Sequence, residues 1–167
     1  CCRSLNWSLG MVVGGSPLML LWMIPCGIGV YIGGITLFAH DEASGGNRKK
    51  LFFGAFIMLL GLVLAGLSPL LVMKMKQSEF PIWLTEGRLI MWYALWVVLG
   101  FYILARCGQA VMNPVPHRMQ AAVGNAIMSI ITLDAVMVLA FCGEQWAVVV
   151  LALLVWFVLG RRLAAAT

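Results

Sequence analysis

Apolar runs of about 20 residues recur along this chain, and their length is the feature that most limits its possible folds. A helix of about 20 apolar residues crosses the roughly 30 Å hydrocarbon layer of a bilayer. Of the 167 residues, 63% are hydrophobic and 10% are charged, whereas about a quarter are charged in a soluble domain. The sequence therefore predicts an all-α fold: a polytopic transmembrane helical bundle, surrounded by membrane lipid, that forms a single membrane domain over residues 1–167.

The breaks between these runs predict five full spans after a shorter first helix. The expected spans are residues 17–39, 50–73, 88–106, 119–142 and 145–160. Residues 4–15 are too short to cross a bilayer, so we interpret them as the end of a truncated helix. We therefore expect the chain to be the C-terminal part of a longer protein whose N-terminal helices are missing here. The tight turn expected at Gly143 and Glu144 should make the last two helices antiparallel neighbours.

Glycines in the first full span predict a close contact with another helix. Four of them follow Pro25: Gly27, Gly29, Gly33 and Gly34. Small residues let the backbones of membrane helices approach one another. We therefore expect a neighbouring helix to pack against this segment.

Lys and Arg gather on one side of the expected topology. That side has eight of them: Arg3, Arg48, Lys49, Lys50, Arg106, Arg118, Arg161 and Arg162. The other side has three: Lys74, Lys76 and Arg88. Because cytoplasmic loops of membrane proteins are enriched in Lys and Arg, we expect the loop 40–49 and the C-terminus to be cytoplasmic. The net charge of +5 is then explained by membrane orientation and does not indicate nucleic-acid binding.

The loop 40–49 places an acidic pair beside a cationic cluster. Asp41 and Glu42 can supply oxygen ligands to Mg²⁺. The cluster Arg48–Lys50 can neutralise phosphate oxygens. Asn47 is expected to be the N-cap of the following helix, whose N-terminus also attracts anions. Two hypotheses follow from these residue types: a site for a diphosphate with Mg²⁺, or an ordinary solvated turn between two spans.

Asp134 is the one carboxylate inside an expected span. Acidic residues within membrane helices are costly and are often functional. One hypothesis makes Asp134 a contact to substrate in a cavity. The other makes it a hydrogen-bonded link to a neighbouring helix, or a neutral acid.

The aromatic and metal-binding residue types elsewhere have simpler interpretations. The aromatic residues of span 88–106 are expected to pack and anchor the helix. The five cysteines form no CxxC pair, and we interpret them as small hydrophobic residues. His40 and His117 lie at loop edges on one side, which does not favour a haem held between opposed helices.

Three segments resemble the UbiA superfamily of membrane prenyltransferases. Arg3-Ser4-Leu5-Asn6-Trp7-Ser8-Leu9-Gly10 is similar to its R-x-L-N-x-x-L-G stretch. The segment from Tyr31 to Glu42 resembles the Y-x-x-G-x-T-x-x-A-R-x-E segment of one bacterial branch. Residues 119–135 resemble the penultimate helix of that branch.

This resemblance implies an integral membrane enzyme, with a bacterial inner membrane as its expected location. The enzymes of this superfamily use Mg²⁺ to transfer an isoprenyl group from an isoprenyl diphosphate to an acceptor, which is often aromatic. The resemblance implies that Asp41 and Glu42 bind the metal. It implies substrate binding by six further residues: Arg3, Asn6, Arg48, Lys49, Lys50 and Asp134.

The chain also departs from the superfamily pattern. The second acidic motif usually has two acids four residues apart, but the residue four after Asp41 is Gly45. The first motif, of Asn-Asp-x-x-Asp type, is absent from these 167 residues. We therefore expect the chain to be inactive alone. The alternative is a non-catalytic polytopic membrane protein, such as a small transporter or an assembly subunit.

Overall fold

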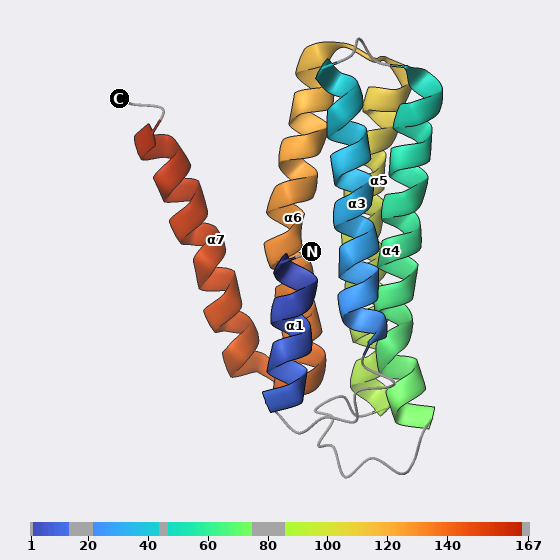
Figure 1. The fold of residues 1–167 in the computed structure, drawn as a ribbon. Helices are drawn as coiled ribbons and strands as arrows, with labels where there is room; N and C mark the ends of the chain where they lie inside the picture. Colours follow the sequence, from blue (N-terminus) through green and yellow to red (C-terminus); the bar gives the residue numbers. More distant parts are fainter. Residues whose placement is uncertain (1, 14–21, 44–46, 75–85, 165–167) are drawn as a thin grey trace.

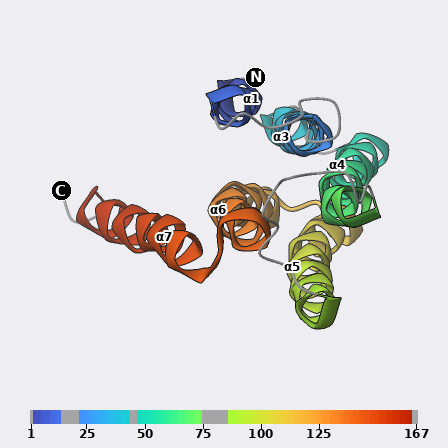
Figure 2. The same ribbon diagram turned by 90° about the horizontal axis from the view of Figure 1, so that it is seen from below.

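The computed structural model describes residues 2–13, 22–43, 47–74 and 86–164, and every regular element in these ranges is an α-helix. The helices are α1 (Cys2–Val13), α3 (Met23–Ala43), α4 (Arg48–Lys74), α5 (Glu86–Met112), α6 (Pro116–Cys142) and α7 (Glu144–Ala164). Helices α3 to α6 stand side by side as a four-helix bundle, and α1 lies against α3 (Figure 1). Helix α7 leaves one end of α6 and diverges from the bundle (Figure 2).

Four of these helices are long and apolar enough to cross a membrane. Their apolar segments are Met23–His40, Arg48–Met73, Arg88–Met112 and Pro116–Cys142. Large apolar side chains cover the outside of the bundle, as at Phe101, which is 74% exposed. Helix α7 has 21 residues, and the part of it whose side chains the structure describes, Glu144–Trp156, forms an apolar helix. The predicted all-α polytopic bundle is confirmed, and the four apolar helices indicate an integral membrane protein.

The loop predicted between the first two full spans, residues 40–49, was too long. Helix α3 continues to Ala43, so His40, Asp41 and Glu42 form its last turn and do not belong to a loop. Residues Arg48 to Lys50 form the first turn of α4. The hydropathy pattern made both helices too short at this end, because a helix satisfies its own backbone hydrogen bonds and can therefore continue from an apolar layer into a polar one.

The predicted loop 107–118 was wrong for the same reason. Helix α5 continues through Arg106 to Met112, and α6 already begins at Pro116. A proline at the first position of a helix is favourable, because the N–H that it lacks would have no intrahelical partner there. The expected break at residues 14–17 and the interfacial segment 80–84 lie outside the described residues.

Glycines allow α3 and α4 to pack closely against each other. A Cβ atom on Gly27 would lie 2.6 Å from the backbone nitrogen of Ala65, and one on Gly34 would lie 2.7 Å from that of Met58. Gly54 and Gly61 provide the matching surface on α4. The predicted close approach is therefore confirmed at Gly27 and Gly34, whereas a Cβ on Gly33 would meet nothing within 4 Å.

Aromatic side chains of α5 form hydrogen bonds to both neighbouring helices, α4 and α6. The indole of Trp92 donates a hydrogen bond to the carbonyl of Val136 in α6 at 2.7 Å. On the other side, Trp96 donates to the carbonyl of Leu62 in α4 at 3.2 Å. The two indoles also stack, with ring centroids 5.2 Å apart. These contacts confirm that the aromatic residues at the centre of α5 have a packing role.

The turn between α6 and α7 is as tight as predicted. Gly143 has φ 91°, a conformation that glycine adopts without a steric penalty, and α7 starts at the next residue. The two helices then separate, so they are close neighbours only near the turn (Figure 1). Among the described α7 side chains, residues 144–156, only Ala147 is buried.

We expect Gly34→Ala to destabilise the bundle by about 1–3 kcal/mol, because the new methyl group would press on the backbone of α4. The matched control is Gly33→Ala, on the same helix and facing open space. It should be neutral or stabilising by up to about 1 kcal/mol, because alanine favours helix. The measurement is the free energy of unfolding in lipid–detergent micelles. Equal losses in both variants would contradict the proposed α3–α4 contact.

Candidate functional site

The end of α3, the start of α4 and the α5–α6 turn lie at the same end of the bundle (Figure 1). We call this the polar end. Its described Lys, Arg and His residues come from four helices: His40, Arg48, Lys49, Lys50, Arg106, His117 and Arg118. Asp41 and Glu42 belong to the same end, in the last turn of α3, but their side chains lie outside the described part of the structure. The fold thus brings together residues that the sequence separates by more than one helix.

The first turn of α4 combines a side-chain N-cap with three exposed cations. Asn47 caps it: the side-chain Oδ1 accepts a hydrogen bond from the backbone N–H of Lys49 at 3.1 Å, which confirms the predicted N-cap. Arg48, Lys49 and Lys50 are all exposed. The helix dipole disfavours cations at an N-terminus by about 0.3–1 kcal/mol each. An anion bound beside them would interact favourably with both the dipole and the three side chains.

The donor set at the polar end suits Mg²⁺ only as part of a phosphate complex. Asp41 and Glu42 are consecutive residues in the last turn of α3. Among the described residues, no group of three His, Cys, Asp or Glu is close enough to hold a metal ion. Mg²⁺, however, commonly binds through one or two carboxylates, with water and substrate phosphate as the other ligands. The acidic turn of α3 therefore fits such an ion together with a diphosphate.

Asp134 links α6 to α1 inside the bundle. It is 8% exposed, and its Oδ1 accepts a hydrogen bond from the indole N–H of Trp7 at 3.3 Å. The predicted link to a neighbouring helix is therefore present. Sequence reasoning did not identify Trp7 as the partner of Asp134. Of the other predicted substrate-binding residues, Asn6 is exposed on α1, and the side chain of Arg3 lies outside the described part.

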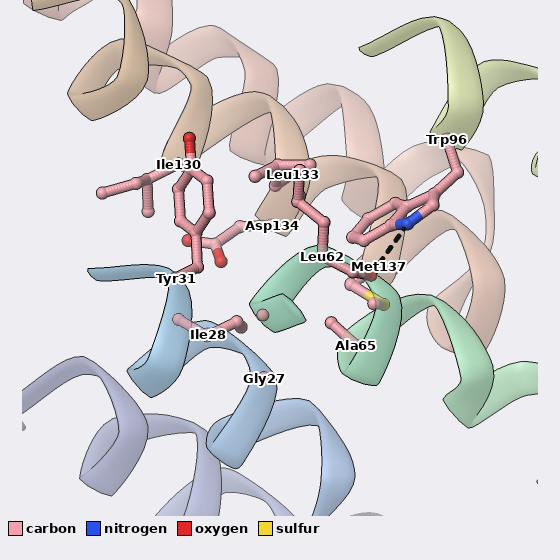
Figure 3. Close-up of a pocket in the computed structure, with 11 residues that line it drawn as sticks. Gly27, Ile28, Tyr31, Leu62, Ala65, Trp96, Ile130, Leu133, Asp134 and Met137 are labelled. Carbon is pink, nitrogen blue, oxygen red and sulfur yellow. Dashed lines mark hydrogen bonds between the residues drawn. The ribbon is translucent and has the colours of Figure 1, made fainter. Parts of the chain in front are cut away.

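Asp134 also borders a small cavity at the centre of the four-helix bundle (Figure 3). The cavity is about 10 Å³ in volume and is otherwise almost entirely apolar, with Leu62, Trp96 and Met137 in its wall. Tyr31 stands beside Asp134, but its hydroxyl is bonded to Ser129 at 2.8 Å. A cavity of this size holds one water molecule at most. In this conformation, the centre of the bundle therefore has no room for a substrate.

A larger apolar groove of about 370 Å³ lies between α4 and α5. Its walls include Leu59, Val63 and Leu67 from α4, and Val97 and Phe101 from α5. Because these side chains are exposed, the groove faces the region that lipid chains would occupy. Its shape and composition suit a hydrocarbon chain.

Comparisons with known protein families, with curated proteins and with solved structures find no match for this chain. The UbiA resemblance is therefore carried by the three sequence segments alone.

We expect the Trp7–Asp134 hydrogen bond to contribute about 0.6 kcal/mol, and no more than about 2 kcal/mol, to stability, as polar contacts between membrane helices do. A double-mutant cycle with Trp7→Phe and Asp134→Leu measures this term as the non-additive part of the unfolding free energy. Trp146→Phe is the control, because Trp146 lies on α7 and is 63% exposed. Strict additivity of the Trp7 and Asp134 changes would show that the bond contributes nothing.

Proposed function

We propose that this chain is part of a UbiA-like prenyltransferase, which transfers an isoprenyl group from an isoprenyl diphosphate to an acceptor that is often aromatic in that superfamily. One observation carries the proposal. The acidic last turn of α3 is followed at once by the Asn47-capped, triply basic first turn of α4. The three resembling segments and the apolar helices support the same function.

The cations of α4 have the first role in this proposal. Arg48, Lys49 and Lys50 bind diphosphate oxygens through charge-assisted hydrogen bonds. The N–H groups at the start of α4 add the attraction that a helix N-terminus offers to a phosphate. The same groups stabilise the negative charge that develops on the leaving diphosphate as the allylic C–O bond ionises.

Asp41 and Glu42 hold Mg²⁺ in this proposal. When bound, the ion neutralises diphosphate oxygens and so assists departure of the leaving group. The two acids therefore bind the metal and keep it next to the basic turn. This role suits their place at the end of α3, a few residues before Arg48 in the sequence.

Three further residues are proposed as substrate contacts. Arg3 and Asn6 lie on α1, and Asp134 lies beside the central cavity. For Asp134 to touch a substrate, the cavity has to enlarge beyond one water molecule. The isoprenyl chain lies along apolar helix surfaces, for which the α4–α5 groove has a suitable wall.

We propose a bacterial inner membrane as the location, with the polar end in the cytoplasm. The first acidic motif would come from additional N-terminal helices of the same protein. The filled centre of the bundle favours a second candidate, a non-catalytic membrane protein such as a small transporter or an assembly subunit. The following experiment separates the two candidates.

We expect Asp41→Asn combined with Glu42→Gln to lower prenyl transfer by the full-length protein about 100-fold or more, because both proposed metal ligands of this chain are removed. Mg²⁺ dependence should weaken in the same variant. The matched control is Glu144→Gln, an exposed acid at the opposite end of α6. Unchanged transfer and unchanged Mg²⁺ dependence in the double variant would remove the acidic turn from the site. Absence of transfer by the unaltered full-length protein would favour the non-catalytic candidate.

The orientation can be measured with two single cysteines in a cysteine-free background. Asn113→Cys lies at the polar end, and Gln145→Cys lies just after the α6–α7 turn, at the other end of α6. A membrane-impermeant maleimide added to intact cells should label Gln145→Cys and spare Asn113→Cys, because the positively charged end is retained in the cytoplasm. The opposite labelling pattern would reverse the proposed orientation.

A further inference from the structure

A polar pocket of about 450 Å³ lies between α5 and α6, apart from the acidic and basic turns of α3 and α4. All of its lining residues come from these two helices. The polar ones are Tyr102, Arg106, His117, Gln120 and Asn125. We call it the α5–α6 pocket. It contains no Asp or Glu among its lining residues, so its charged and polar side chains together favour an anion.

Arg106 is held in place at the wall of this pocket. Its guanidinium carbon lies 5.7 Å from the centre of the Tyr102 ring, four residues earlier on α5. This contact supports the guanidinium from one face. A guanidinium presents several N–H donors in a planar fork, which matches the oxygens of a phosphate group.

Asn125 supplies an independent sign that a ligand belongs here. Its Nδ2 is shielded from solvent and has no hydrogen-bond partner among the residues that the structure describes. Buried donors in proteins almost always have an acceptor. Asn125 lines the α5–α6 pocket, so a rotation of its side-chain amide towards the pocket would let Nδ2 donate to an oxygen atom of a bound anion.

The depth of the pocket indicates the kind of anion. Arg106 lies six residues before the end of α5, roughly 9 Å inside it, and His117 is the second residue of α6. If both helices cross a bilayer, this level is close to the lipid headgroups. Basic pockets between membrane helices on the cytoplasmic side are known to bind anionic headgroups. Met128 adds an apolar contact on the side of α6 that runs deeper into the bundle.

We propose that the α5–α6 pocket binds a phosphate group, and that an anionic phospholipid supplies it. Arg106 binds two phosphate oxygens, while Gln120, Asn125 and His117 donate to the remaining ones. None of these residues belongs to the proposed prenyl-transfer site, so the lipid site can be tested independently of that activity.

Native mass spectrometry of the full-length protein in detergent tests this proposal. Three probes are titrated separately: dioleoylphosphatidylglycerol, dioleoylphosphatidylcholine and inorganic phosphate. We expect one phosphatidylglycerol to bind at least about tenfold more tightly than phosphatidylcholine, and Arg106→Gln to remove that preference. Tight binding of inorganic phosphate without a preference for phosphatidylglycerol would overturn the lipid as the source of the phosphate.

The matched control is Arg118→Gln. It removes the same charge from the same end of the bundle, but Arg118 does not line the pocket. Its affinity for phosphatidylglycerol should stay within about twofold of the unaltered protein. Equal losses of phosphatidylglycerol affinity in Arg106→Gln and Arg118→Gln would show general attraction of the lipid to positive charge and would overturn the site.

Asn125→Leu provides a second variant, which keeps every charge. It removes the buried donor, so we expect about tenfold weaker phosphatidylglycerol binding without a lower melting temperature in lipid-free detergent. If Arg106→Gln does not fold, the lipid affinity of Asn125→Leu still tests the proposed site. Unchanged lipid affinity in Asn125→Leu would contradict the proposed role of the amide.

Discussion

The backbone contact between α3 and α4 is the constraint on which the polar end depends. Gly27 and Gly34 on α3 lie close to the backbone of Gly61 and Gly54 on α4. Such close packing leaves little freedom in the register of the two helices. It therefore holds the last turn of α3 next to the first turn of α4. The helix turns that carry the acidic pair and the basic cluster are therefore neighbours because of backbone contacts along α3 and α4, the nearest of which involves Gly54, four residues after Lys50.

The sequence was sufficient to predict the helical class, the order of the spans and the cap at Asn47. Those features depend on local properties: the length of apolar runs, and a side chain that bonds to its own helix start. The helix ends were predicted less well. Hydropathy falls at Arg106 and at His40, yet α5 and α3 continue, because a helix ends where its backbone bonding ends and not where its side chains become polar.

Contacts between distant residues could not be predicted in the same way. The sequence identified Asp134 as an unusual acid, but its partner Trp7 lies 127 positions away, on a helix with several other candidate residues. The same holds for Arg106 and Asn125, which line one pocket only because α5 and α6 are antiparallel neighbours. Of the four glycines expected to face another helix, the sequence could not separate Gly34, which touches α4, from Gly33, which does not.

Counting Lys and Arg treats every cation at the polar end as equivalent, but the structure gives them different surroundings. Arg48, Lys49 and Lys50 stand exposed on a helix start, where the dipole also attracts anions. Arg106 lies more than one turn inside α5, against Tyr102 and beside a buried amide that lacks a partner among the described residues. A charge needed only to orient a helix could lie anywhere near its end. The position of Arg106 in a polar pocket therefore requires a reason beyond orientation, and a bound phosphate supplies one.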